Sequence, residues 1–127
     1  MAKQLLVVED DESEGLYYKL ALEREGYVVD VVDSADAAVA YVREHPPDAV
    51  ILDINMPEKD GIEALGEMMA INPKLPVIIN TAYSAYKDNF MTWSAVAYVV
   101  KSSDLTELKE VVGKVVRGES LEGRYGA

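Results

Sequence analysis

The chain has 127 residues, of which 50% are hydrophobic, and its 23 acidic and 12 basic side chains give a formal net charge of −11. These totals indicate one globular domain that buries roughly 68% of its unfolded surface, and the acidic balance argues against direct binding to nucleic acid. The absence of cysteine excludes disulfides and thiolate chemistry and fits a cytoplasmic protein. We expect neither a signal peptide nor a membrane span.

Five short apolar runs, rich in β-branched residues, predict buried strands. In chain order they are Leu5–Val8, Tyr27–Val32, Ala49–Leu52, Pro76–Asn80 and Val96–Val100. Their strict alternation with helical patterns predicts an α/β fold with a doubly wound parallel sheet and helices on both faces. We expect residues 1–118 to form the domain and residues 119–127 a flexible tail.

Apolar spacing predicts which side chain positions each of the first three helices buries. The first helix runs from about Ser13 to Gly26, and its predicted buried face is Leu16, Tyr17, Leu20 and Ala21. The second is capped by Asp33 or Ser34, ends at His45, and buries Ala35, Ala38, Val39 and Val42. The third closes at Asn72-Pro73 and buries Ile62, Leu65, Met68 and Met69.

Two further helices are expected in the second half of the chain. An aromatic stripe at helical spacing predicts the fourth, with Tyr83, Tyr86, Phe90 and Trp93. We expect part of this stripe to form an exposed patch for a partner. The last helix has a cap at Ser103 or Asp104 and buries Leu105, Leu108, Val111, Val112, Val115 and Val116.

Four of the five predicted strands end in a polar side chain. These side chains are Asp10 together with Glu9, then Asp53, Thr81 and Lys101. Because parallel strands place their carboxyl ends at one edge of the sheet, we expect these groups to converge. Carboxylates about 4 Å apart repel each other by roughly 4 kcal/mol at an effective dielectric near 20, and an oxygen-only ligand set favours Mg²⁺.

A carboxylate beside Mg²⁺, a hydroxyl and an ammonium is a complete set for phosphoryl transfer to an aspartate. Asp53 would be the nucleophile, Lys101 would hold a phosphoryl oxygen, and Thr81 would donate a hydrogen bond to the acyl phosphate. Positioning and charge would supply nearly all of the catalysis. The sequence therefore predicts a phosphoacceptor site at Asp53.

Four segments in this order resemble the receiver domain of bacterial two-component response regulators. They are Leu-Leu-Val-Val-Glu-Asp-Asp-Glu from Leu5, Val-Ile-Leu-Asp-Ile-Asn-Met-Pro-Glu-Lys-Asp-Gly from Val50, Ile-Asn-Thr-Ala from Ile79 and Ala-Tyr-Val-Val-Lys from Ala97. The resemblance spans about Lys3 to Arg117. It implies a flavodoxin-like (βα)5 fold with strand order 2-1-3-4-5.

The resemblance also implies a metal site for Mg²⁺. Asp53 corresponds to the phosphoacceptor, Glu9 and Asp10 correspond to the acidic pair, and the main-chain carbonyl of Asn55 would be a further ligand. The acidic run leaves a second register open, in which Asp10 and Asp11 are the pair. The position of Val8 as the last buried residue of its strand favours Glu9 and Asp10.

The remaining family positions belong to the switch. The resemblance implies that Thr81 is the switch hydroxyl, that Lys101 corresponds to the family's lysine, and that Tyr98 is the aromatic that changes rotamer on activation. The family commonly has a cis proline after the lysine, whereas Ser102 follows here, and a cis bond before a non-proline residue costs about 2.5–4 kcal/mol. This departure leaves the isomer of the Lys101–Ser102 bond open.

The function implied by the resemblance is that of a stand-alone signalling domain. A histidine kinase or histidine phosphotransfer protein would phosphorylate Asp53, and the face made of the fourth helix, fifth strand and fifth helix would then bind a downstream protein target or a second copy. One alternative is a Mg²⁺ phosphohydrolase with an aspartyl-phosphate intermediate, against which Asn55 counts because such enzymes need an acid there. Another is a phosphorylation-independent scaffold of the same fold.

Overall fold

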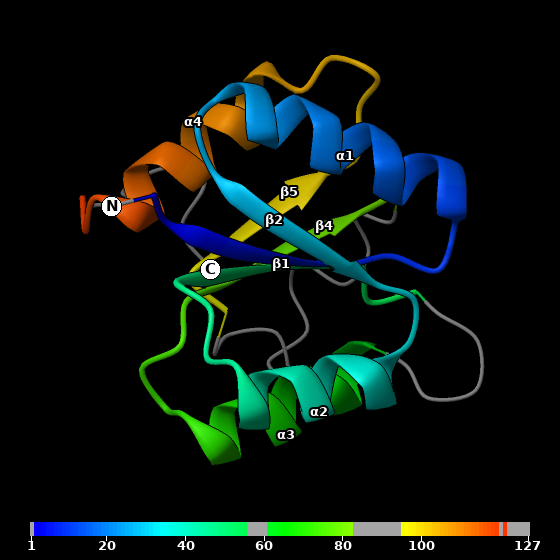
Figure 1. Ribbon diagram of the computed structural model, residues 1–127, viewed down its shortest axis with the longest axis vertical. Helices are drawn as coiled ribbons and strands as arrows, with labels where there is room; N and C mark the ends of the chain where they lie inside the picture. Colours follow the sequence, from blue (N-terminus) through cyan, green and yellow to red (C-terminus); the bar gives the residue numbers. More distant parts are fainter. Residues whose placement is uncertain (1, 56–60, 83–94, 120, 122–127) are drawn as a thin grey trace.

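The computed structural model describes residues 2–55, 61–82, 95–119 and 121. Within them the chain forms five strands and four helices that alternate from the N-terminus to the fourth strand (Figure 1). The strands are β1 (Gln4–Val8), β2 (Val28–Val32), β3 (Ala49–Leu52), β4 (Val77–Thr81) and β5 (Ala97–Val100). The helices are α1 (Glu12–Arg24), α2 (Ala35–Glu44), α3 (Gly61–Ile71) and α4 (Thr106–Val116).

The strands form one parallel sheet in the order β2-β1-β3-β4-β5, which confirms the predicted fold and strand order. β1 lies between β2 and β3, with Val8 opposite Val32 on one side and Leu52 on the other. β4 in turn pairs Thr81 with Val100 of β5. The last residues of β2, β1 and β3 are therefore in register, as are those of β4 and β5, while β4 extends two residues beyond the partner of Leu52, so the segments that follow the strands share one edge.

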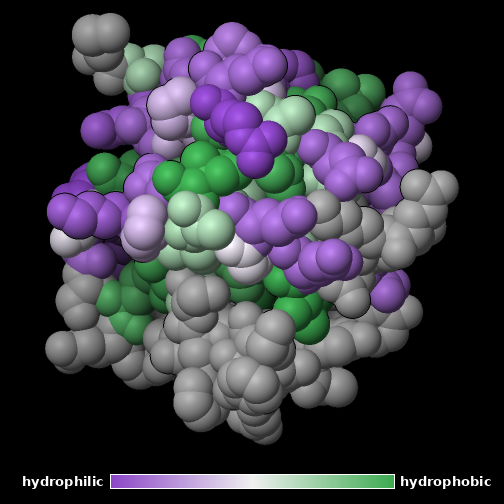
Figure 2. All heavy atoms as spheres, turned by 90° about the horizontal axis from the view of Figure 1, so that it is seen from below, coloured by the Kyte–Doolittle hydropathy of each residue, from purple (hydrophilic) through white to green (hydrophobic). Residues whose placement is uncertain are grey.

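Helices cover both faces of the sheet (Figure 1). Successive side chains of a strand point to opposite faces, so Leu6 and Val8 pack into the cluster formed with α2 and α3, whereas Leu5 and Val7 pack with α1 and α4. On the α2 and α3 side, hydrophilic side chains border hydrophobic ones over the described part of the surface (Figure 2). No helix in the described ranges combines the length and the apolar character needed to cross a bilayer.

The buried face of α1 differs from the prediction. Leu16, Tyr17 and Leu20 were expected to face the core, but they are 54%, 49% and 48% exposed. The residues that α1 buries are Gly15, Tyr18, Ala21 and Leu22. Six of the seven residues from 16 to 22 are apolar, so two stripes at helical spacing compete. The stripe that faces the sheet includes Gly15, where an added Cβ would lie only 3.0 Å from Cγ1 of Val31, so the small residue allows α1 to approach β2 closely.

The second and third helices follow their predicted patterns. Ser34 caps α2 by accepting a hydrogen bond from the Ala37 amide, and the four residues predicted to face inward are buried. α3 ends at Ile71, before Asn72-Pro73, and buries Leu65 and Met68, while Ile62 and Met69 are partly buried against the same cluster. His45 is the C-cap of α2, a structural position.

Of the residues predicted to be buried around the last helix, Leu105, Leu108, Val111 and Val112 are buried, whereas Val115 and Val116 are only partly buried. The start of the helix also differs from the prediction. Leu105 occupies the cap position without a side-chain bond, so the predicted cap at Ser103 or Asp104 is wrong in position. Asp104 nevertheless accepts a hydrogen bond from the Thr106 amide at 2.9 Å, which satisfies the first donor of the helix. The aromatic helix predicted around residues 83–93 lies outside the described residues.

Candidate phosphoacceptor site

The site lies at the carboxyl edge of the sheet, where backbone hydrogen bonds extend beyond the strand ends. The Glu9 amide donates to the Val32 carbonyl at 3.0 Å, and the Asp53 amide donates to the Val8 carbonyl at 3.1 Å. The Lys101 amide donates to the Thr81 carbonyl at 2.7 Å. Because these bonds continue the sheet, the residues after β1, β3 and β5 are held on rigid backbone.

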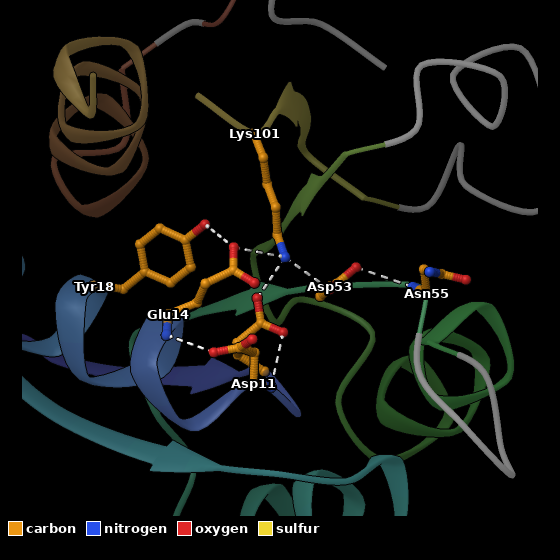
Figure 3. A network of polar contacts seen from close by, with 7 residues as sticks. Asp11, Glu14, Tyr18, Asp53, Asn55 and Lys101 are labelled. Atoms are coloured by element: carbon orange, nitrogen blue, oxygen red, sulfur yellow. Dashed lines mark hydrogen bonds and ion pairs between the residues drawn. The ribbon is translucent and has the colours of Figure 1, made fainter. Parts of the chain in front are cut away.

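Lys101 brings the predicted acidic groups together (Figure 3). Its Nζ lies 2.5 Å from Oε1 of Glu9 and 3.0 Å from Oδ2 of Asp53, and it donates a hydrogen bond to each. The Glu9 and Asp53 side chains are only 2% and 7% exposed. The convergence predicted for the ends of the first, third and fifth strands is therefore present, with the ammonium at its centre.

Burial and charge shift the proton affinities of this cluster. Burial raises the pKa of Glu9 to about 7, and the neighbouring charge of Asp53 acts in the same direction against the Lys101 hydrogen bond. Burial disfavours the charged form of Lys101, but its bonds to Glu9 and Asp53 outweigh this and raise the pKa of its ammonium above the usual range. The ammonium is therefore fixed as a cation that two buried carboxylates share.

Three of the described carboxylates offer a cation site. Oxygens of Glu9, Asp10 and Asp53 lie within 4.8 Å of one another, with Asp10 exposed and the other two buried. A hard divalent cation prefers such an all-oxygen set and keeps several waters, for which the exposed Asp10 leaves room. The set is the first of the two registers considered above, because Asp11 instead caps α1 by accepting from the Glu14 amide at 3.0 Å.

Two backbone amides, one shortly after Asp53 and one at the start of α3, fix the segment that follows β3. The Asn55 amide donates to Oδ1 of Asp53 at 3.0 Å, and the Gly61 amide donates to the Ile54 carbonyl at 3.0 Å. A Cβ on Gly61 would lie 2.6 Å from the Asp53 carbonyl oxygen, a contact that real Cβ atoms do not make. Glycine is therefore required at this position, since α3 begins directly against the backbone of Asp53.

The switch residues predicted from the sequence are buried. Thr81 has no exposed surface and ends β4, next to Lys101 through the backbone bond described above. Tyr98 is 3% exposed and belongs to the cluster on the α2 and α3 side, so its ring lies inside the core. The described residues contain no cis peptide bond, and the Lys101–Ser102 bond is trans.

Two residues of this network were missed by the sequence interpretation. Oε1 of Glu14 lies 3.2 Å from the Lys101 ammonium and accepts a hydrogen bond from the Tyr18 hydroxyl at 3.5 Å. Glu14 looked like an ordinary acid in the first turn of a helix, a position where acids are favoured by the helix dipole. Its four-residue spacing from Tyr18 was the available signal, but only the true rotation of α1 brings the pair to Lys101.

Known proteins show the same fold and the same sequence pattern. The model of the response regulator receiver domain family matches residues 5–113. The response regulator TrrA of Thermotoga maritima, solved in complex with Mg²⁺ and BeF, is 38% identical with a TM-score of 0.87 over 89% of this chain and 98% of that chain. A second structure holds TrrA in complex with the histidine kinase ThkA, at 38% identity, a TM-score of 0.84, and coverage of 89% and 97%.

Curated relatives include longer proteins. The transcriptional regulatory protein ZraR of Salmonella typhimurium is 36% identical over 114 residues, which are 88% of this chain but 26% of that protein. The chain thus spans about a quarter of the length of the first curated relatives that it matches.

The chain belongs to the response regulator receiver domain family, because the family model covers most of its length and TrrA matches it over nearly its whole chain. It is a two-component signalling domain that is switched by phosphorylation, rather than a classical enzyme. Glu9, Asp10 and Asp53 form an oxygen-only ligand set that suits Mg²⁺, and the TrrA structure contains that ion.

Proposed function

We propose that Asp53 accepts the phosphoryl group from a phosphohistidine on a histidine kinase or a histidine phosphotransfer protein. The observation that carries this proposal is the buried Asp53 carboxylate, 3.0 Å from the Lys101 ammonium and within reach of two further carboxylates. An Oδ atom of Asp53 would attack phosphorus, the N–P bond of the donor would break, and its imidazole would leave. The product is an acyl phosphate on Asp53.

Glu9, Asp10 and Asp53, with the Asn55 carbonyl, would hold Mg²⁺. When bound, the ion supplies positive charge that offsets the charge of the phosphoryl oxygens. The chain's own groups do the rest: Lys101 donates to a phosphoryl oxygen from its place between Glu9 and Asp53, and the rigid ends of β1 and β3 orient the carboxylates. The Thr81 hydroxyl would donate a hydrogen bond to the acyl phosphate.

Phosphorylation would then change the surface that includes β5 and α4. Lys101 directly follows β5, and Tyr98 is buried within that strand, so a shift of either residue acts on the same edge of the sheet. A change from 1:99 to 99:1 between two states needs about 5.5 kcal/mol, which a few charge-assisted hydrogen bonds can supply. The phosphorylated face would bind a downstream protein target or form a homodimer.

The kinase of this chain is proposed from the TrrA relative, whose structure contains the histidine kinase ThkA. The same proposal places the domain in the cytoplasm, because two-component kinases present their phosphohistidine there. The boundary at residue 118 and the flexible tail over residues 119–127 stay predictions. Leu121, within that tail, is partly buried against the α1 and α4 cluster.

Intact mass after incubation with acetyl phosphate tests the proposal. With Mg²⁺ the wild type should gain one phosphoryl group, and the gain should be absent with EDTA and in Asp53→Asn. Asp48→Asn is a matched control, because it removes an aspartate at the opposite end of β3 and should leave the gain intact. If the wild type gains no mass with Mg²⁺, the proposal is wrong and the scaffold alternative stands.

The phosphohydrolase alternative makes a different prediction in the same sample. It requires multiple turnovers of an ordinary phosphomonoester, whereas a receiver consumes about one equivalent of a small acyl phosphate before its own hydrolysis limits the rate. Asn55 lies where such an enzyme needs its acid, and its side chain is a carboxamide, which carries no acidic proton to transfer. We therefore expect no turnover of p-nitrophenyl phosphate above that of Asp53→Asn.

A further inference from the structure

The Lys101 ammonium has three carboxylate neighbours, one more than the phosphoacceptor site requires. Besides Glu9 and Asp53, it pairs with Oε1 of Glu14 at 3.2 Å. An ammonium carries three N–H donors and no acceptor. Hydrogen bonds to Glu9 and Asp53 use two of these donors, and the Glu14 carboxylate lies beside the third neighbour position, so an incoming phosphoryl oxygen meets Glu14 at the ammonium.

One contact to the side chain of Glu14, at 3.5 Å, and one to its main chain accompany the Lys101 ion pair (Figure 3). The Tyr18 hydroxyl, one turn further along α1 and buried at 3% exposure, donates to the same Oε1 that contacts Lys101. The Glu14 amide is fixed by the capping side chain of Asp11. The carboxylate therefore bridges a buried tyrosine and the ammonium, which a freely solvated helix acid would not do.

The position of Glu14 separates it from the cation ligands. The described carboxylates that come together as a cation site are those of Glu9, Asp10 and Asp53, and Glu14 is not among them. Its side chain is 42% exposed, whereas those of Glu9 and Asp53 are almost fully covered. It also lines a pocket of about 250 Å³ together with Asp53 and Lys101. Glu14 thus contacts the ammonium from the solvent side of the site.

We propose that Glu14 is a positioning residue that holds the Lys101 ammonium in the unphosphorylated domain and competes with the phosphoryl group for it. The inference rests on the proposed function of Asp53. Of the three contacts to the ammonium, that of Glu14 is the longest and the most exposed, so it is the one that a phosphoryl oxygen displaces. Its negative charge also repels the incoming anion. Glu14 therefore favours the unphosphorylated state.

The test measures binding of beryllium fluoride, an analogue of the phosphoryl group, to the full chain at saturating Mg²⁺. Amide chemical shifts report the titration. Glu14→Gln removes the charge and should bind the anion about fivefold more tightly, the upper range for an exposed ion pair. Affinity for Mg²⁺ alone should not rise, because removing a nearby carboxylate does not favour a cation. A gain in affinity for the anion without a gain in affinity for Mg²⁺ distinguishes release of Lys101 from a general stabilisation of the fold.

Glu12→Gln is the matched control. It makes the same charge change in the first turn of α1, but Glu12 does not line the pocket of Asp53 and Lys101; it lines a neighbouring pocket beside β2, together with Glu9 and Asp10. We expect less than a twofold change for it. The inference is overturned if Glu14→Gln binds beryllium fluoride no more tightly than wild type, or if Glu12→Gln gains as much. If the wild type binds beryllium fluoride no more tightly than Asp53→Asn does, the proposed function itself is wrong, and the inference that rests on it is wrong as well.

Discussion

Replacement of Lys101 by methionine should destabilise the metal-free domain by about 3 kcal/mol. The change removes the ammonium but keeps most of the side-chain volume, and it leaves the buried Glu9 and Asp53 carboxylates facing each other. At an effective dielectric near 20, a pair at 3 Å attracts by about 5.5 kcal/mol, and desolvation offsets part of this. Removing one partner of a buried pair costs about 3–5 kcal/mol, and we take the lower value because Lys101 is 14% exposed.

Urea unfolding in EDTA measures this loss, with Lys19→Met as the control. Lys19 forms an exposed pair with Glu23 at 3.1 Å, together with a hydrogen bond to the Val29 carbonyl, and its loss should cost no more than about 1 kcal/mol. Mg²⁺ should restore part of the stability of Lys101→Met, because a bound cation replaces the missing charge. Equal losses in the two variants would refute the view that Lys101 balances the buried acids.

Three further changes test the backbone and the periphery of the site. Gly61→Ala should cost at least about 2 kcal/mol in thermal unfolding, because its Cβ would meet the Asp53 backbone, and an unchanged melting temperature would contradict this. Asp11→Ala removes the cap of α1 and should cost about 1 kcal/mol by the same assay, without abolishing phosphorylation. Burial, with the hydrogen bond and charge of Asp30, raises the pKa of Tyr41 to about 12, so the stability contributed by its protonated form is complete below about pH 10 and is lost as pH rises through about 12. The unfolding free energy of wild type minus that of Tyr41→Phe should fall over this interval. A constant difference would show that Tyr41 has the same pKa in the folded and unfolded states.

The sheet was predictable because each of its strands can be recognised from a pattern in the amino-acid sequence. A strand buried on both faces, such as Ala49–Leu52, is a continuous apolar run, and the polar residue that follows marks its carboxyl end. The alternation of strands and helices then fixes which ends share an edge. The meeting of Glu9, Asp53 and Lys101 follows from these two rules, since no loop conformation enters the argument.

The rotation of α1 was not predictable by the same reasoning. Leu16 and Leu20 match a helical stripe as well as Tyr18 and Leu22 do, so local periodicity does not choose between the two faces. The choice depends on packing against the sheet, which is a property of the whole fold. The contact of Glu14 with Lys101 depends on this rotation, and it was missed for the same reason.

The charge balance of the site links cation binding, phosphoryl transfer to Asp53 and the positioning of Lys101. The pocket around Asp53 is lined by one ammonium and five carboxylates, a formal charge of −4: Glu9, Asp10, Asp11, Glu14, Asp53 and Lys101. Such a site attracts a divalent cation but repels a phosphoryl donor, so cation binding must precede or accompany transfer. Asp11 is committed to the helix cap and Glu14 to Lys101, which leaves Glu9, Asp10 and Asp53 to meet the ion. By the proposal above, Glu14 then influences how readily the ammonium turns toward the phosphoryl group.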